Sequence, residues 1–340
     1  MKKSLVPATL FACGVLLPAV ISRADAPAPH YHLLKTISLD GEGGWDYLSV
    51  DSHARRLYIA RSTHVTVVDI DAGRAVGDIP DLNGVHGVAI DAPDGRGFTS
   101  NGRSNSVTIF DLKTLKKLGE VSVGTGPDAI LFDPSSRRVF TFNGRSQDAT
   151  AIDAKTGKVV GTVSLPGRPE SAVADGKGHL YDNIEDKSEI AVINAKTLKV
   201  ENVWPMAPGE GPSGLAIDAK HRRLFSVCDN QKMAVLDADT GRVLATPAIG
   251  NGPDAAGFDP SSGLAFSSNG EDGTLTVVRE GPPNQFQAVA TVPTQPSART
   301  MALDEKTHHV FTVAAKTAPG GQGRRRNYVP GSFVVLEYGP

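Results

Sequence analysis

The sequence is poor in cysteine, with only two among its 340 residues. Cys13 lies in an apolar N-terminal stretch, and Cys228 closes a short apolar run typical of a strand. Once the N-terminal stretch is removed no intramolecular disulfide can form, and we expect Cys228 to be a buried structural thiol. No Cys-x-x-Cys-His sequence is present, which excludes covalently attached haem.

Long apolar runs and local catalytic motifs are missing as well. Beyond the N-terminal stretch no apolar run is long enough to cross a bilayer, so we predict no membrane span. The chain lacks a Gly-x-Ser-x-Gly elbow, a phosphate-binding Gly-Lys-Ser/Thr loop and a His-Glu-x-x-His pair. The formal net charge is −2, and acidic residues dilute the few Arg pairs, so the composition does not require a nucleic-acid partner.

The first 24 residues have the pattern of a signal peptide. Lys2 and Lys3 precede an apolar stretch from Leu5 to Ile21, and small residues stand at Ser22 and Ala24, where a signal peptidase reads the chain. We predict a signal peptide over residues 1–24, a single domain over residues 25–340, and a periplasmic or secreted location.

The main feature present is a repeat of about 40 to 45 residues that returns seven times. Each copy has a short apolar run closed by an acid, a turn, a β-rich run, a Gly/Asn turn and a further alternating run. The run-closing acids are Asp51, Asp91, Asp133, Asp175, Asp218, Asp259 and Asp304. Four short strands in a repeat of this length are typical of propeller blades, because one such sheet cannot bury both of its faces alone. We therefore predict an all-β fold, a seven-bladed β-propeller of four-stranded antiparallel blades.

The two ends of the chain complement each other. Residues 32–39 resemble the outermost strand of other copies, whereas the last copy ends at 333–337 with no outer strand after it. Pairing the two would complete the seventh sheet and leave no open edge. We predict that the N-terminal strand closes the last blade.

One polar residue stands five positions before each run-closing acid, at the start of the predicted innermost strand. These residues are Asp46, His86, Asp128, Glu170, Ser213, Asp254 and Arg299. In a closed ring they converge on the axis at one rim, and the Gly/Asn turns at the same rim add Asn101, Arg103, Asn143, Arg145 and Asn269. A concave site with convergent polar groups is a ligand-site hypothesis. The alternative is a solvated channel lining with no ligand.

The rim also raises the question of a metal. Asp46, Asp128, Glu170 and Asp254 could together hold a hard cation such as Ca²⁺ through oxygen ligands, with His86 as a candidate acid or base. No cofactor is predicted beyond that candidate cation. The last copy carries an insertion at 319–330, Pro- and Gly-containing with three consecutive arginines, which would hang over the same rim as a disordered loop or a cationic lid.

Three segments resemble a known family. Val-Gly-Thr-Gly-Pro-Asp-Ala at 123–129, Arg-Val-Phe-Thr-Phe-Asn at 138–143 and Val-Thr-Ile-Phe-Asp at 107–111 resemble the YVTN-type repeat of YncE-like seven-bladed propellers. The resemblance covers nearly all of residues 25–340 and implies a periplasmic or extracellular propeller, in a family where some members bind DNA or other partners. Related propellers include lactonases and a streptogramin lyase, which use residues of the central channel.

Together these observations predict an exported, monomeric, non-catalytic binding or scaffold propeller. Its axial rim would capture a small molecule or a segment of a protein partner. Two alternatives stay open: a metal-assisted lyase or lactonase acting at the central channel, and a DNA-binding propeller.

Overall fold

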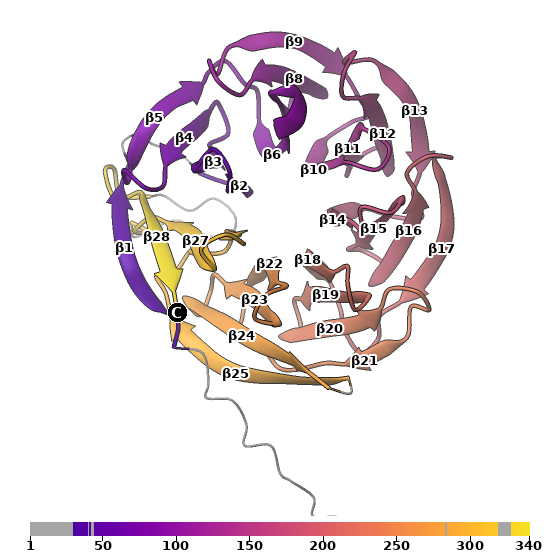
Figure 1. Ribbon diagram of the computed structural model, residues 1–340, viewed down its shortest axis with the longest axis vertical. Helices are drawn as coiled ribbons and strands as arrows, with labels where there is room; N and C mark the ends of the chain where they lie inside the picture. Colours follow the sequence, from indigo (N-terminus) through magenta and orange to yellow (C-terminus); the bar gives the residue numbers. More distant parts are fainter. Residues whose placement is uncertain (1–29, 40, 42–43, 283, 319–327) are drawn as a thin grey trace, which may run out of the picture.

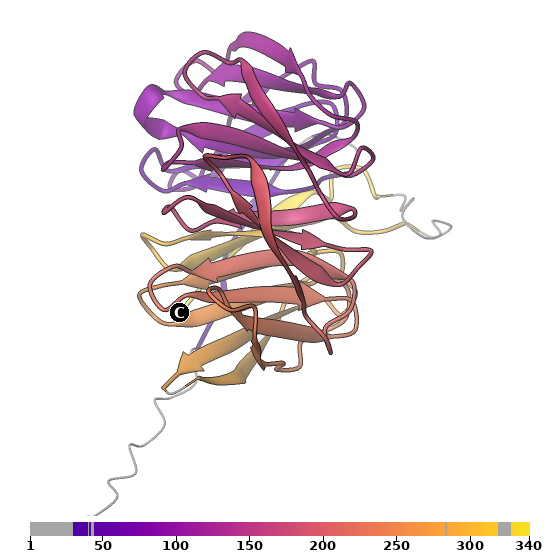
Figure 2. The same ribbon diagram turned by 90° about the vertical axis from the view of Figure 1, so that its right-hand side faces the viewer.

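The computed structural model describes residues 30–39, 41, 44–282, 284–318 and 328–340. These residues form seven four-stranded antiparallel sheets that follow one another around a common centre (Figure 1). Figure 2 shows the same ring from its side. The described part of the chain contains one short 3-10 helix, η1 (Ala92–Asp94), and no helix long and apolar enough to cross a membrane. The predicted seven-bladed β-propeller is confirmed.

The first four blades run in simple order from the centre outwards. Blade 1 comprises β2 (Leu48–Asp51), β3 (Arg56–Ala60), β4 (Val65–Asp69) and β5 (Arg74–Ile79). Blade 2 comprises β6 (Val85–Asp91), β7 (Arg96–Asn101), β8 (Ser106–Asp111) and β9 (Lys117–Ser122). Blade 3 comprises β10 (Pro127–Asp133), β11 (Arg138–Asn143), β12 (Asp148–Asp153) and β13 (Val159–Ser164). Blade 4 comprises β14 (Pro169–Ala174), β15 (His179–Ile184), β16 (Glu189–Asn194) and β17 (Lys199–Pro205).

Two further blades repeat that order, and the seventh draws on both ends of the chain. Blade 5 comprises β18 (Pro212–Asp218), β19 (Arg223–Cys228), β20 (Lys232–Asp237) and β21 (Val243–Ala245). Blade 6 comprises β22 (Pro253–Asp259), β23 (Leu264–Asn269), β24 (Thr274–Gly281) and β25 (Gln285–Pro293). Blade 7 comprises β26 (Met301–Asp304), β27 (His309–Ala314), β28 (Val334–Gly339) and β1 (His32–Ser38).

Strand β1 closes the ring, as predicted. It pairs antiparallel with β28, with Ile37 opposite Val335, and the Leu39 backbone N–H donates to the Phe333 carbonyl at 3.0 Å. Figure 1 shows the indigo strand β1 against the yellow strand β28 at the outer edge of the blade. The first and last parts of the described chain therefore form one sheet, and unfolding of either exposes the same apolar cluster.

The hydrophobic core is divided among the interfaces between blades. Seven clusters of buried apolar side chains each draw on two neighbouring sheets, from the cluster of Tyr58 and Phe110 between blades 1 and 2 to that of Ile37 and Trp45 between blades 7 and 1. Cys228 lies in the cluster between blades 4 and 5 as a buried free thiol, and burial raises its pKa to about 11.

Contacts between a basic and an acidic side chain, here called latches, tie neighbouring blades together at the rim where the innermost strands end. In each latch, a basic residue of the hairpin after an innermost strand contacts the run-closing acid of the preceding blade. The pairs are Arg55 with Asp304, Arg137 with Asp91, Arg222 with Asp175, and His308 with Asp259. All four donors have a positive φ, a position that Gly95 and Gly263 occupy in blades 2 and 6. These hairpin arginines therefore have a structural role in holding neighbouring blades together.

Two predictions fall outside the described residues. The signal peptide at 1–24 and most of the insertion, residues 319–327, are not among them. Thr317 and Tyr328, which lie on either side of residues 319–327, form an isolated antiparallel bridge between β27 and β28 in the chain.

Candidate functional site

The seven rim residues predicted from the sequence line a single axial cavity of about 1720 Å³. Each blade contributes one of them at the entry of its innermost strand: Asp46, His86, Asp128, Glu170, Ser213, Asp254 and Arg299. Figure 1 shows the innermost strands β2, β6, β10, β14, β18 and β22 facing the centre. Residues far apart in the chain therefore meet around one space.

A backbone irregularity aims these side chains at the axis. In blades 2 to 6 the register of the innermost strand shifts at its first residues, for example between Pro127 and Ile130 around Asp128. A β-bulge of this kind redirects a side chain that regular alternation would point at a neighbouring blade. Proline at the first position of β10, β14, β18 and β22 fits, because the first residue of a strand needs no ladder donor.

Five of the seven residues form a continuous chain of alternating charge. His86 Nδ1 lies 2.6 Å from Asp46 Oδ2 and 3.4 Å from Asp128 Oδ1. Arg299 forms ion pairs with Asp254 and, at 3.3 Å, with Asp46. It also donates to the Trp45 carbonyl at 2.7 Å. This series of ion pairs ends in a carboxylate on both sides, at Asp128 and at Asp254.

The ion pairs perturb the pKa of both members of the His86–Asp128 contact. Burial raises the pKa of Asp128 to about 6, and repulsion from Asp46 and Asp254 adds to it while His86 and Arg299 oppose it. For His86 burial lowers the pKa, but the hydrogen bond to Asp46 and the charge of Asp128 outweigh it, and the net shift is upward. Both pKa values therefore lie above the ordinary values of their groups.

Glu170 and Ser213 occupy the part of the ring that the charge chain leaves open. Burial, followed by repulsion from Asp128, Glu185 and Asp254, raises the pKa of Glu170 well above its ordinary value. Ser213 Oγ donates to the Pro253 carbonyl at 2.9 Å. Glu170 thus presents a carboxyl whose ionisation is opposed by its surroundings until a cation approaches.

A second set of charges stands nearer the mouth, in the turns between the second and third strands of the blades. Arg103 and Arg145 line the cavity from blades 2 and 3, and Asp229 and Glu271 line it from blades 5 and 6. Between them Arg168 pairs with Glu185 at 2.7 Å in blade 4. The mouth is cationic on one side and anionic on the other.

The three predicted asparagines do not line the cavity. Asn101, Asn143 and Asn269 are buried, and each carboxamide donates to a Thr side chain of the next strand and accepts from a Thr or Ser of its own. The sequence prediction placed them at the rim because they precede a Gly turn. Alternation along the strand instead turns their side chains into the blade, so we leave them out of the proposed site.

The cavity also has an aromatic wall that the sequence analysis did not identify. The rings of Trp45 and Tyr328 lie 4.8 Å apart, and that of Phe333 lies 5.3 Å from Trp45. The signal available was weak, because Trp45 is adjacent to the predicted Asp46 but Tyr328 and Phe333 belong to the insertion and its edge. Contact between them depends on ring closure.

Part of the predicted metal set comes together. One ligand atom from each of Asp46, His86 and Asp128 lies within 4.8 Å of the others. Glu170 and Asp254, the remaining predicted ligands, are not in this group. The same ligand spacing occurs at the opposite rim in Asp218, His221 and Glu280, where His221 is exposed. A cation at the axial group would compete with protons for His86, because a histidine ligand binds a metal only through a deprotonated ring nitrogen.

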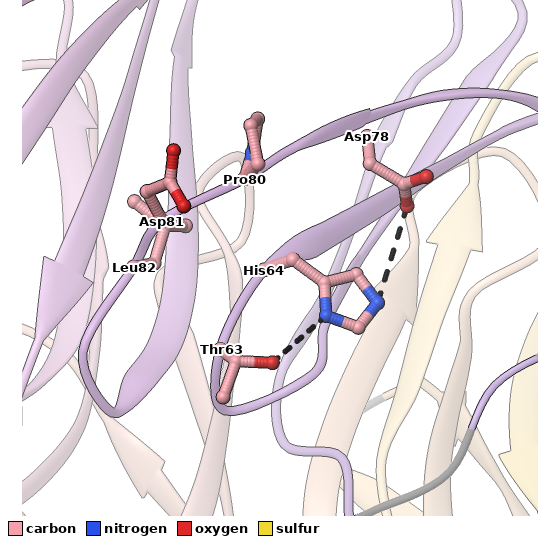
Figure 3. A pocket seen from close by; sticks show the side chains of 6 residues that line it. All are labelled: Thr63, His64, Asp78, Pro80, Asp81 and Leu82. Carbon is pink, nitrogen blue, oxygen red and sulfur yellow. Dashed lines mark hydrogen bonds and ion pairs between the residues drawn. The ribbon is translucent and has the colours of Figure 1, made fainter.

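A smaller pocket of about 560 Å³ lies at blade 1 (Figure 3). Its lining comes from one continuous segment, with His64 Nδ1 at 3.1 Å from Thr63 Oγ1 and His64 Nε2 at 4.0 Å from Asp78 Oδ1. The pocket gathers no groups from separate blades, and we assign it no role.

No protein-family model matches the chain, and no curated protein matches it in sequence. Among solved structures, hydrazine synthase of Kuenenia stuttgartiensis is similar at 14% identity with a TM-score of 0.73, over 87% of this chain and 96% of that one. The WD40 repeats of RRP9 are similar at 12% identity with a TM-score of 0.76, over 92% of this chain and 99% of that one. At these identities the likeness establishes the propeller fold alone.

Proposed function

We propose that this chain is an exported, non-catalytic binding propeller that captures a small molecule or a segment of a protein partner in its axial cavity. The observation that carries the proposal is the convergence of one side chain from each blade on a single cavity of about 1720 Å³. This volume exceeds the several hundred Å³ typical of small-ligand pockets. A propeller fold is compatible with a binding or scaffold role, and fold alone does not specify chemistry.

The charges in the cavity favour a ligand-binding site over a channel lining that is only solvated. Charged groups on separate blades form ion pairs only where the ring holds them together, and Glu170 is left without a cationic partner among the described residues. Ionisable groups whose pKa is perturbed by burial and by nearby charges are typical of functional sites. Export and a monomeric state are parts of the proposal that rest on the sequence pattern.

A blocking variant tests the proposal. Gly144 lines the cavity, its φ is not positive, and a Cβ there would meet no atom closer than 3.8 Å, so Gly144→Trp should fill the mouth without strain. Gly119 lies on the outer strand β9 with open space around it, and Gly119→Trp is the matched control. Each protein is isolated under non-denaturing conditions, and released compounds and bound polypeptides are identified by mass spectrometry.

We expect a compound or polypeptide to accompany the wild-type protein and Gly119→Trp but not Gly144→Trp. Equal recovery with all three proteins, or recovery with none, would contradict a binding function for the axial cavity.

A second candidate is a metal-assisted lyase or lactonase, favoured by the spacing of Asp46, His86 and Asp128. In such an enzyme Asp46 and Asp128 would hold the cation and His86 would move a proton. Elemental analysis after mild dialysis separates the two candidates. Stoichiometric divalent metal that is lost in Asp128→Asn favours the enzyme, and a metal-free protein favours the binding propeller.

DNA binding is not part of the proposal. The arginines of the hairpins at the opposite rim, such as Arg137 and Arg222, are engaged by Asp91 and Asp175. Phosphate contacts need cations that are available to the backbone of the nucleic acid.

A further inference from the structure

The axial cavity contains acidic and basic side chains that have no partner among the described residues. Among the described residues, the carboxylate of Glu170 and the guanidinium groups of Arg103 and Arg145 have no ion pair and no side-chain hydrogen bond. The other charged groups near the cavity floor already have ion-pair partners, because His86 and Arg299 link Asp46 to its neighbours on both sides. Recognition of a charged ligand therefore falls to these three residues.

The three residues belong to consecutive blades. Arg103 lies in the turn between β7 and β8, Arg145 in the turn between β11 and β12, and Glu170 at the entry of β14. The turn of blade 3 borders the entry of blade 4, since a Cβ on Gly144 would lie 3.9 Å from the Pro169 carbonyl oxygen. Residues adjacent to Arg145 and Glu170 in the chain are thus in contact.

The side-chain stems of Arg103 and Arg145 each pack against a glycine of the preceding link. A Cβ on Gly84 would lie 2.6 Å from the Cγ of Arg103, and one on Gly126 would lie 3.0 Å from the Cγ of Arg145. Both glycines have positive φ, 70° for Gly84 and 67° for Gly126, so each turn requires glycine for its backbone and leaves room for the arginine stem. The stems lie against these glycines, and both arginines are exposed and line the cavity, where guanidinium groups could bind an anion.

We infer that the ligand of the axial cavity is a small zwitterion, with an ammonium or guanidinium group at Glu170 and a carboxylate or phosphate at Arg103 and Arg145. The inference rests on the proposed function and deepens it. A ligand with only one charge would leave one side of the cavity unpaired, and desolvating an unpaired charge is costly.

The surroundings of Glu170 favour a cationic group on the ligand. Carboxylates of Asp128, Glu185, Asp254 and Asp46 lie near it, and burial together with their charges raises its pKa well above its ordinary value. A cationic group at hydrogen-bond distance would stabilise the ionised form of Glu170.

The test uses ω-amino acids from 4-aminobutanoate to 8-aminooctanoate as probes, because a series of lengths covers the unknown spacing of the two charges. The matched single-charge probes are the alkylamine and the alkanoate of the same chain length. Binding is measured by isothermal titration calorimetry at pH 8. We expect one length of amino acid to bind about tenfold more tightly than either single-charge probe, since one charge-assisted hydrogen bond is worth about that factor.

Variants assign each charge to its residue. Glu170→Gln should weaken the amino acid and the amine about tenfold and leave the alkanoate unaffected. The double variant Arg103→Gln, Arg145→Gln should weaken the amino acid and the alkanoate but not the amine. Glu120→Gln, on the exposed outer strand β9, is the control for loss of a carboxylate elsewhere and should change nothing. Unchanged thermal melts establish that the variants fold.

Equal affinity of the amino acid and the single-charge probes, or no binding of any length, would overturn the inference. An unchanged affinity of the best probe for Glu170→Gln would overturn it as well. The proposed function fails separately, because it fails only if Gly144→Trp and Gly119→Trp recover the same compounds or none.

Discussion

The Nδ1 atom of His86 lies 2.6 Å from Asp46 Oδ2, across the junction of the first two blades. The two residues are 40 positions apart in the chain, and only the ring brings them together. The contact begins the chain of alternating charge that runs from Asp128 to Asp254 around part of the cavity floor. It also helps to raise the pKa of His86.

The first prediction concerns the titration of His86. Because its pKa is raised in the folded protein, the stability it contributes is fully present below its unfolded pKa of about 6.5 and is lost as the pH rises through the folded value. Asp46→Asn should lower the pKa of His86, as measured from its imidazole resonances by NMR. An unchanged titration curve would contradict the ion pair.

The second prediction concerns ring closure. Ile37 in β1 is 3% exposed and Leu34 in the same strand is 42% exposed. Ile37→Asn should lower the free energy of unfolding by about 3 kcal/mol, because it removes buried apolar surface and buries an amide. Leu34→Asn should change it by less than about 0.5 kcal/mol. Denaturant unfolding measures both, and similar values for the two variants would mean that β1 does not close blade 7.

The third prediction concerns the latches. Burial would raise the pKa of Asp175, but backbone N–H groups of His179 and Lys177 together with Arg222 outweigh it and lower the pKa. Arg222→Gln should destabilise the protein by about 3 kcal/mol at pH 7, because it leaves a buried carboxylate without its cation. The loss should shrink as the pH falls through the depressed pKa of Asp175, where the carboxylate is protonated in either protein.

Arg242 in the same blade is exposed and serves as the control, with an expected change below about 0.5 kcal/mol for Arg242→Gln. A pH-independent cost of Arg222→Gln, or equal costs for the two variants, would show that the latch is not electrostatic.

The fourth prediction concerns Asp182, which is fully buried in β15 with neither carboxyl oxygen hydrogen-bonded among the described residues. The equivalent residues in blades 2 and 3, Thr99 and Thr141, donate to an Asn two positions later, but blade 4 has Ile184 there. Burial alone raises the pKa of Asp182 well above its ordinary value. Its contribution to stability is therefore fully present below about pH 4 and is lost as the pH rises toward the folded pKa.

Asp182→Val should stabilise the protein, and the difference from wild type should grow with pH by about 1.4 kcal/mol per unit between the two pKa values. Chemical denaturation at pH 5 and pH 8 measures this difference. A difference that stays constant with pH would mean that Asp182 has a partner or is not buried.

The fold could be predicted because the blades of a propeller repeat at a nearly constant interval along the sequence. The run-closing acids from Asp51 to Asp304 mark that interval. Closure by β1 could be predicted because the last repeat has no outer strand of its own, whereas the N-terminal segment resembles an outer strand. The seven rim positions that line the cavity also followed, because every blade places its rim residue at the same position of the repeat. The ion pairs did not follow, since which rotamers meet across blades depends on bulges that spacing cannot reveal.

The asparagines and the latches show where a pattern misleads. Asn101 precedes a Gly turn, which suggested exposure, yet its partner Thr108 is known only from the register of β7 and β8. Arg137 stands in a solvated hairpin in the sequence, and its bond to Asp91 of the preceding blade appears only in three dimensions. Both roles depend on the pairing of neighbours and not on local composition.

The most direct test of a binding function for the axial cavity is a crystal structure of the protein isolated with its natural ligand retained. We predict density at the ring centre in contact with side chains of at least three blades, Glu170 among them. Density bound to a lateral face, with only water at Asp46, His86 and Glu170, would contradict the central claim.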